Sequence, residues 1–210
     1  MHIPHLRLRS SLTAFVALVL ASAPAAIAQP LHFDDVVLNA AGFNSSPFTS
    51  YRGYTFENFG VLTSASPFGT GNNPSSPTNF AYGQAFGSSY IYRTDVNFNF
   101  RTAFLSFRQL DLDASPATIT VRGYRAGDVT ATFEQDVLLT NANQRFDFYF
   151  DDIEELEFET DPLQAGGRSA VMALDDVDVS VVPEPASIAL VASGLAGILL
   201  IVRRRNGRKA

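Results

Sequence analysis

Several stretches within residues 29–181 alternate between apolar and polar residues with a period of two, which constrains the fold more than any other feature. Phe146, Phe148 and Phe150, for example, all fall on one face of their segment. Such alternation of aromatic and β-branched residues is typical of a strand with one buried face. No window in this region has the period of a helix. The alternating stretches are residues 102–110, 117–125, 128–139, 145–150, 153–160 and 170–181.

The spacing of these stretches predicts how they are arranged. They recur at intervals of roughly ten residues, with Gly and Pro between them, as in two-sheet sandwiches. Ala126-Gly127 predicts a hairpin between residues 117–125 and 128–139. We therefore predict an all-β fold, an antiparallel two-sheet β-sandwich of the jelly-roll type, with about eight or more strands.

The N-terminal segment has the features of a secretory signal peptide. Arg7 and Arg9 precede an apolar stretch, and Ala26-Ile27-Ala28 forms a small-residue cleavage pattern. Cleavage is expected after Ala28, which assigns residues 1–28 to the signal peptide and residues 29–181 to an exported domain. The alternative is a retained membrane anchor.

A second apolar segment occupies residues 186–202, which contain no charge and no proline. As a helix it would be about 25 Å long, near the lower limit for crossing a bilayer. Arg203, Arg204 and Arg205 follow directly and are expected to stay on the cytoplasmic side. We predict a single transmembrane helix that places the preceding domain outside. The alternative of a buried core helix fits the basic flank poorly.

The charge of the exported domain restricts its partners. Residues 29–181 hold eight arginines, no lysine and 20 of the 21 acidic residues, a difference of −12. Such a field repels nucleic acid and anionic lipid. The chain has no cysteine, which excludes disulfides, thiol nucleophiles and Cys-ligated zinc.

Val182, Pro183, Glu184 and Pro185, the apolar stretch and the arginine cluster together resemble the PEP-CTERM sorting signal. The resemblance implies a Gram-negative bacterium, often one that makes exopolysaccharide and biofilm. It also implies a partner, exosortase, which cleaves near Pro-Glu-Pro. Two prolines keep the segment extended and accessible. Residues 182–210 would then be a transient anchor in the inner membrane, and the product would reach the cell surface or extracellular matrix. The alternative is a permanent single-span anchor.

The exported domain also resembles a known class. Residues 31–35, 51–59 and 173–179 resemble ectodomains common in PEP-CTERM proteins. Those are similar to galactose-binding-like and carbohydrate-binding jelly rolls. The resemblance implies an association with extracellular polysaccharide.

The alternation changes phase within the last predicted strand. Met172 and Leu174 are apolar on one parity, whereas Val177 and Val179 are apolar on the other. A shift of one residue exchanges the two faces, so a bulge is expected at residues 174–176.

A bulge at this place would turn a carboxylate inward, where it needs a partner. Asp34 and Asp35 could join Asp175 and Asp176 if the first and last strands approach. Oxygen ligands at this density suit a structural Ca²⁺, and no other cofactor is expected. The alternative is that Asp175 and Asp176 end a turn or face solvent.

Two further sets of residues could bind or act on sugars. Residues 151–161 contain seven acidic residues, but Leu156 and Phe158 share one face, so Glu155, Glu157 and Glu159 are expected on a solvated face. Tyrosines could stack on sugar rings or pack with one end in water. The candidates are Tyr51, Tyr54, Tyr82, Tyr90, Tyr92 and Tyr124, with Arg52, Arg93 and Arg125. The polar residues 64–78 form either a surface loop or a ligand-facing one.

No catalytic residue is predicted. His32 is the sole histidine outside the signal peptide, and neither G-x-S-x-G nor H-E-x-x-H occurs. The sequence therefore favours a non-enzymatic surface or matrix protein, with no nucleic-acid partner. The alternatives are a specific carbohydrate-binding module and a small polysaccharide hydrolase.

Overall fold

The computed structural model describes the chain in several stretches. The described residues are 28, 30–43, 48–64, 75, 78–83, 87–109, 117–160, 170–182 and 194–199. The chain divides into two compact units, one of which is Ala28–Val182. In the other unit only residues 194–199 are described, and they form a short helix.

Several sequence predictions concern residues outside this description. They are Ala26 of the cleavage pattern, Pro183, Glu184 and Pro185, most of residues 186–202, and Arg203, Arg204 and Arg205. Within the described residues, no helix has the length and apolar character needed to cross a membrane.

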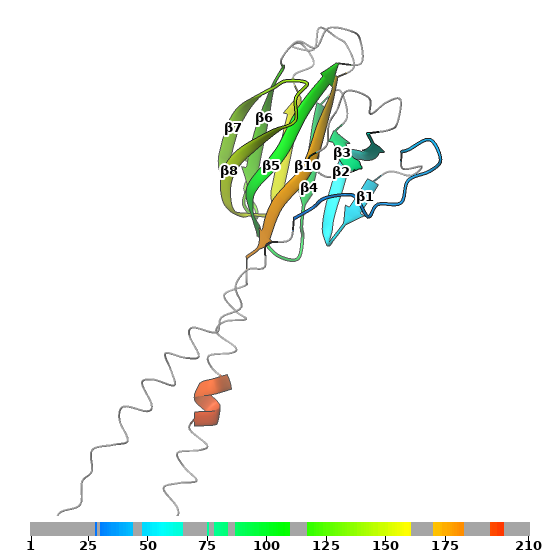
Figure 1. The fold of residues 1–210 in the computed structure, drawn as a ribbon. Helices are drawn as coiled ribbons and strands as arrows, with labels where there is room; N and C mark the ends of the chain where they lie inside the picture. Colours follow the sequence, from blue (N-terminus) through cyan, green and yellow to red (C-terminus); the bar gives the residue numbers. More distant parts are fainter. Residues whose placement is uncertain are drawn as a thin grey trace, which may run out of the picture. The chain divides into compact units, whose positions relative to one another are not determined.

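The unit Ala28–Val182 is built from strands, and every pairing between its described strands is antiparallel. The predicted all-β, antiparallel fold is thereby confirmed. The described strands follow the order β7-β6-β9-β4-β2-β3-β10-β5-β8, with β1 paired to β2 (Figure 1). Their bounds are β1 Phe48–Tyr51, β2 Tyr54–Thr63, β3 Asn79–Gly83, β4 Gly87–Tyr92, β5 Phe98–Gln109, β6 Ala117–Tyr124, β7 Phe133–Leu139, β8 Gln144–Ile153, β9 Glu155–Thr160 and β10 Ala170–Val181.

Strand β2 connects the two layers of the sandwich. Its first half, Thr55–Glu57, pairs with β4, and its second half, Phe59–Thr63, pairs with β3. Between them Asn58 has a φ of 60°, a conformation that asparagine tolerates better than most residues. Asn58 Nδ2 donates to the carbonyl oxygen of Ser88 on β4 at 2.9 Å. The two expected sheets are therefore one hydrogen-bonded sheet that bends at Asn58.

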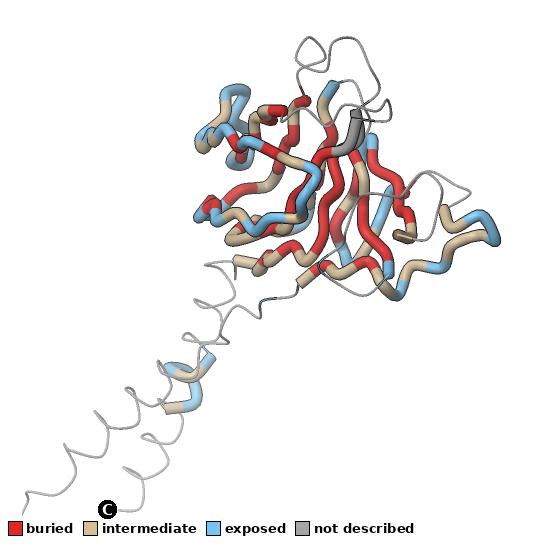
Figure 2. Tube along the Cα trace, turned by 45° about the horizontal axis from the view of Figure 1, so that its top comes forward, coloured by how far each residue is buried: buried red, intermediate tan, exposed pale blue. Residues whose placement is uncertain are grey.

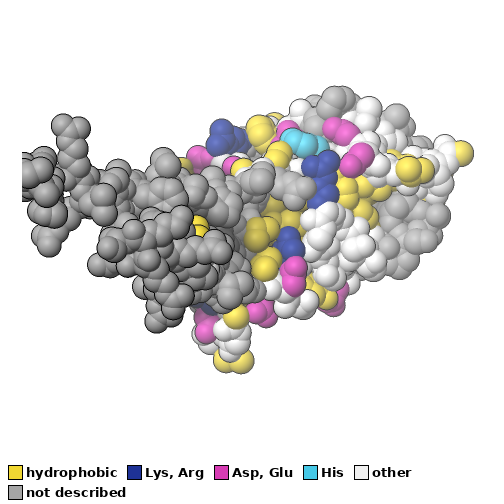
Figure 3. Space-filling view, turned by 90° about the horizontal axis from the view of Figure 1, so that it is seen from below, with side chains coloured by type: hydrophobic (Ala, Val, Ile, Leu, Met, Phe, Trp, Pro, Cys, Tyr) yellow, Lys and Arg dark blue, Asp and Glu magenta, His cyan; other side chains and the backbone are white. Residues whose placement is uncertain are grey.

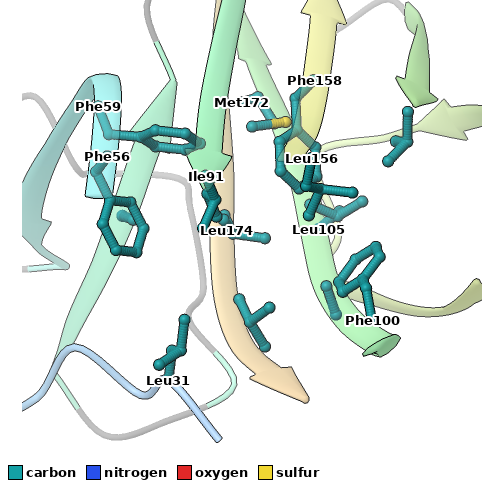
Figure 4. Close-up of a cluster of buried hydrophobic side chains, with 14 of the residues drawn as sticks. Leu31, Phe56, Phe59, Ile91, Phe100, Leu105, Leu156, Phe158, Met172 and Leu174 are labelled. Carbon is teal, nitrogen blue, oxygen red and sulfur yellow. The ribbon is translucent and has the colours of Figure 1, made fainter. Parts of the chain in front are cut away.

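The core lies between the two layers. Phe100 on β5 meets Phe158 on β9 with ring centroids 6.3 Å apart, and Phe133 on β7 stacks on Phe150 of β8 at 5.2 Å. Buried residues run along the central strands, and side chains of β2, β5, β9 and β10 converge on one cluster (Figures 2 and 4). The layers approach so closely at Gly123 that a Cβ there would lie 2.9 Å from the Phe150 ring. Strand-by-strand alternation therefore supplies a continuous apolar interior.

One strand starts later than its sequence suggests. The hairpin at Ala126-Gly127 is confirmed by the pairing of β6 with β7. However, β7 begins at Phe133, because Asp128 closes a turn instead of continuing the strand. The Asp128 amide donates to the carbonyl oxygen of Arg125 at 3.0 Å, and Thr132 Oγ1 donates to the Asp128 carboxylate at 2.8 Å.

The first described residues lie along the last strand. Leu31 pairs with Val177, and Ala28 pairs with Ser180. The approach of the first and last segments, which the calcium hypothesis required, is therefore present. It brings His32 into contact with Asp176 in the middle of β10.

Candidate functional site

The expected phase change in β10 is a bulge. The pairing of β10 with β5 shifts register between Asp175 and Asp178, and Asp176 has a φ of 45°. Leu174 and Val177 are both fully buried on either side of the shift. This confirms the bulge and its cause, because the extra residue returns the apolar parity to the core. As a result Asp175 is buried, with 2% of its surface exposed.

The polar segment at residues 75–79 bonds to two of the predicted carboxylates. Ser75 Oγ donates to Asp175 at 3.1 Å. Asp34 accepts from the amide and hydroxyl of Thr78, both at 3.2 Å, and from the amide of Asn79 at 3.1 Å. Most of residues 64–78 lies outside the described residues, but Ser75 and Thr78 are tied to these carboxylates.

The other two predicted carboxylates lie in separate contacts. Asp176 pairs with Nδ1 of His32. Asp35 accepts from the hydroxyl of Tyr51 and from Arg52 at 3.2 Å. Acidic, basic and histidine side chains gather on the corresponding face (Figure 3). The Tyr51 hydroxyl bond, together with Arg52, holds the pKa of Asp35 below its usual value. Burial and the neighbouring Asp35 raise the pKa of Tyr51 to about 12.

The four residues proposed for Ca²⁺ therefore occupy one region but have different partners. Among the residues described, no three His, Cys, Asp or Glu side chains gather closely enough to hold a metal ion. Asp34 and Asp175 accept from the segment 75–79, Asp176 contacts His32, and Asp35 contacts Tyr51. Calcium binding by Asp34, Asp35, Asp175 and Asp176 stays a prediction.

A second polar site lies on the outer face of β4, β9 and β6. It centres on Glu157, which alternates with the core residues of β9 and yet is only 7% exposed. In the sheet, Glu157 lies opposite Tyr90 of β4 on one side and Arg122 of β6 on the other. Its carboxylate accepts from Ser88 Oγ at 2.5 Å, Tyr124 OH at 2.5 Å and Tyr90 OH at 3.2 Å. We call this group, Ser88, Tyr90, Arg122, Tyr124 and Glu157, the Glu157 network.

Arg122 connects the network to two further carboxylates. Its Nε donates to Glu134 at 2.7 Å, and its Nη1 donates to Glu159 at 2.5 Å and lies 3.5 Å from Glu157. The surrounding hydrogen bonds and charge raise the pKa of Arg122. The guanidinium thus holds three acidic side chains of β7 and β9 on one surface.

The electrostatics of the network keep Glu157 ionised. Burial by itself would raise the pKa of Glu157, but hydrogen bonds from Ser88 and Tyr124 and the charge of Arg122 outweigh it, so the pKa is lowered. The neighbouring Glu155 shows the opposite result. Burial, and then the negative charge of Glu157, raise the pKa of Glu155.

The alternation predicts a solvated face for Glu155, Glu157 and Glu159, and this is wrong for Glu157, which is buried. The alternation itself is correct, since Leu156 and Phe158 are in the core. The missed signal was that Tyr90, Arg122 and Tyr124 each alternate with core residues on their own strands, as Glu157 does on β9. Pairing of those strands with β9 could not be read from the alternation.

The candidate sugar-binding tyrosines divide among several environments. Tyr90 and Tyr124 belong to the Glu157 network. Tyr92 lies opposite Glu155 on the same face of the sheet. Tyr54 is 1% exposed in the core, beneath the guanidinium of Arg93. The other members are Tyr51 beside Asp35, Tyr82 over Gly60, Arg52 over Tyr51 and Arg125 over Phe133. The structure brings together three tyrosines of the six.

The C-terminal segment matches a known family of sorting motifs. Residues 181–205 match the PEP-CTERM protein-sorting motif. The PEP-CTERM motif thus begins at the last residue of β10. No curated protein matches the chain.

Solved structures with a similar fold include adhesin domains and carbohydrate-binding modules. The K2 cleaved adhesin domain of Lys-gingipain has a TM-score of 0.44 at 10% identity, covering 76% of this chain and 100% of that one. A family 11 carbohydrate-binding module of a Clostridium thermocellum cellulase has a TM-score of 0.37 at 12% identity, covering 77% and 98%. A family 61 module in complex with β-1,4-galactotriose has a TM-score of 0.32 at 12% identity, covering 68% and 95%.

Proposed function

We propose that this protein is exported and sorted by an exosortase, which cleaves the chain at its Pro-Glu-Pro segment. The product is a non-enzymatic β-sandwich at the cell surface or in the extracellular matrix. One observation carries the proposal: the sorting motif starts at Val181, where the last strand ends. Every described strand of the unit therefore ends at or before Val181, the first residue of the motif. Cleavage within Val182, Pro183, Glu184 and Pro185 would release the whole folded unit and divide none of its strands.

The proposed route follows from the order of the segments. The N-terminal signal peptide would direct export, and residues 186–202 with the arginine cluster would hold the precursor in the inner membrane until cleavage. A Gram-negative host that forms an exopolysaccharide-containing biofilm fits this route. Without the cleaved segments the unit has a strongly negative charge, which keeps it from anionic surfaces.

Expression in a Gram-negative host with an exosortase, and in the same host lacking that gene, tests this function. The full chain should lose about 2–3 kDa at its C-terminus only in the first host, since about 110 Da per residue is removed over residues 186–210. Replacing Pro183 and Pro185 by Ala should abolish the shortening. Pro30→Ala is the matched control, because its carbonyl still accepts from Arg52. Equal processing with and without exosortase would refute the proposal.

A second candidate function is carbohydrate binding at the Glu157 network. Two tyrosines flank a buried carboxylate and an arginine on the side of the sheet opposite the core, which supplies ring surfaces together with donors and acceptors for sugar hydroxyls. The lowered pKa of Glu157 disfavours a role as proton donor, so binding fits the site better than hydrolysis.

Binding to glycans is measured by co-sedimentation of the full chain with the host's extracellular polysaccharide, in Ca²⁺ and then in EDTA. Saturable binding should weaken at least about fivefold in Tyr90→Ala and Tyr124→Ala, since truncating an aromatic side chain that anchors a ligand costs more than about 1 kcal/mol. Tyr149→Ala is the control, because Tyr149 is 66% exposed on β8. Equal loss in all three variants would reject the network as the site. Loss in EDTA would support the predicted calcium site.

A further inference from the structure

The point where the chain leaves the β-sandwich is held by the fold itself. The amide of Val182 donates to the carbonyl oxygen of Asn97 at 2.9 Å. The residue before it, Val181, pairs with Phe98 on β5. Pro183 is the next residue, so no free linker separates the anchored chain from the Pro-Glu-Pro segment.

The residues before Val182 are also fixed on both sides. Ser180 pairs with Asn99 of β5 and with Ala28 of the N-terminal segment, and Val179 is fully buried. A protease that draws several residues on the N-terminal side of the cleaved bond into its active site would have to break these pairings. Cleavage of the folded protein must therefore occur close to its surface.

The length of chain between Val182 and the cleaved bond limits how far from the surface of the domain cleavage can occur. An extended chain spans at most about 3.3–3.6 Å per residue, so Pro185 lies within about 11 Å of the anchored Val182. An enzyme that reaches it also meets the residues around Asn97.

Those residues form a defined surface, which we call the exit surface: Arg93, Asp95, Asn97, Asp151 and Asp152. Asn97 Nδ2 donates to Asp152 at 2.9 Å, which joins the β4–β5 connection to the end of β8. Asp95 pairs with Arg93 at 2.7 Å, and Asp151 pairs with Arg101 at 2.5 Å. The carboxylates face outward, since the side chains of Asp95 and Asp151 are 64% and 54% exposed, whereas that of Arg93 is 14% exposed.

We propose that the exit surface is a docking surface for the exosortase, and this inference rests on the proposed function. The proposed occupant is the outer surface of the protease next to its active site, and the exposed carboxylates of Asp95 and Asp151 would suit basic, hydrogen-bond-donating groups there. Exposed carboxylates disfavour anionic lipid headgroups, so the surface suits a protein rather than the bilayer itself. Docking positions the Pro-Glu-Pro segment for cleavage while the sandwich stays folded.

Charge reversal combined with a linker tests this proposal. The first variant of the full chain carries Asp95→Lys and Asp151→Lys. Its matched control carries Asp136→Lys and Asp147→Lys, two exposed carboxylates on β7 and β8 with the same change in charge. Each variant is also made with eight Gly/Ser residues inserted between Val182 and Pro183, which add a reach of about 15 Å. Pulse-chase labelling in the exosortase host gives the rate of processing.

Docking predicts that the exit-surface variant is processed at least about fivefold more slowly than the control when the segment is attached directly. With the linker the two should be processed at equal rates, because the enzyme no longer has to contact the exit surface. The proposal is overturned if the variant is as fast as the control without the linker. It is also overturned if the variant remains equally slow with the linker, since a folding defect would act in both. Failure of the wild-type chain to be shortened at all would instead overturn the proposed function.

Discussion

Replacing Glu157 by Gln tests whether the Glu157 network stabilises the sandwich through the carboxylate charge. Glu157→Gln keeps the size and one acceptor oxygen, but presents an amide to hydroxyls that now donate to a carboxylate. Leaving buried donors poorly satisfied costs about 1–3 kcal/mol, and the remaining oxygen places the expected loss at about 1–2 kcal/mol. For a unit of this size that is a fall in Tm of about 2–8 °C.

The stability lost in Glu157→Gln should depend on pH, and the pKa shift of Glu157 determines the direction of that dependence. The pKa of Glu157 is lowered in the folded protein, so its contribution is present above its usual value of 4.5 and is lost as the pH falls through the folded pKa. Thermal unfolding of the full chain between pH 3 and pH 8 measures this. The difference in Tm between wild type and Glu157→Gln should be largest near neutrality and should close at the acidic end.

Glu159→Gln is the matched control for this experiment. The side chain of Glu159 is 45% exposed and contacts the same Arg122, so its loss should cost less than about 1 kcal/mol. A loss in Glu157→Gln no greater than in Glu159→Gln would refute the reasoning. A difference that persisted unchanged at pH 3 would do so as well, because the charge would then be irrelevant.

Substitutions at three other positions have expected outcomes in the same unfolding assay. Glu155→Gln should raise the free energy of unfolding by up to about 0.5 kcal/mol at pH 7, because burial and the charge of Glu157 raise its pKa, and the gain should vanish below pH 4. Gly123→Ala should cost about 1–3 kcal/mol, since its Cβ would overlap the Phe150 ring, and an unchanged Tm would contradict the close packing of the layers. Asn58→Val should cost about 1–2 kcal/mol more than Asn58→Gly, because only the former is strained at a φ of 60°; equal losses would show that the bend is not conformationally demanding.

The alternation of side chains predicted the faces of the strands but not their neighbours. Phe148 and Phe150 are in the core as expected, and the phase change around Asp175 correctly indicated a bulge. Both are local properties, since a period of two and its interruption involve only adjacent residues. The turn at Asp128 was missed because its side-chain bond to Thr132 competes with the strand pattern.

The Glu157 network could not be predicted for a different reason. Its members come from β4, β6 and β9, and β9 lies between two strands that precede it in the sequence. Nothing in the pattern of residues 153–160 specifies those neighbours. The burial of Glu157 depends on the tyrosines that flank it, and so it follows from strand order rather than from the acidic run.

The central position of β10 has a mechanical consequence. The strand lies between β3 and β5, and it is paired with β5 from Ala170 to Val181. Its ladder bonds run across the strand direction. A tensile load applied through the C-terminal end would therefore be shared by many hydrogen bonds in shear, instead of opening them one after another. A precursor tethered at Val182 would resist drag or stretching better than one tethered through the edge strand β7 or β8.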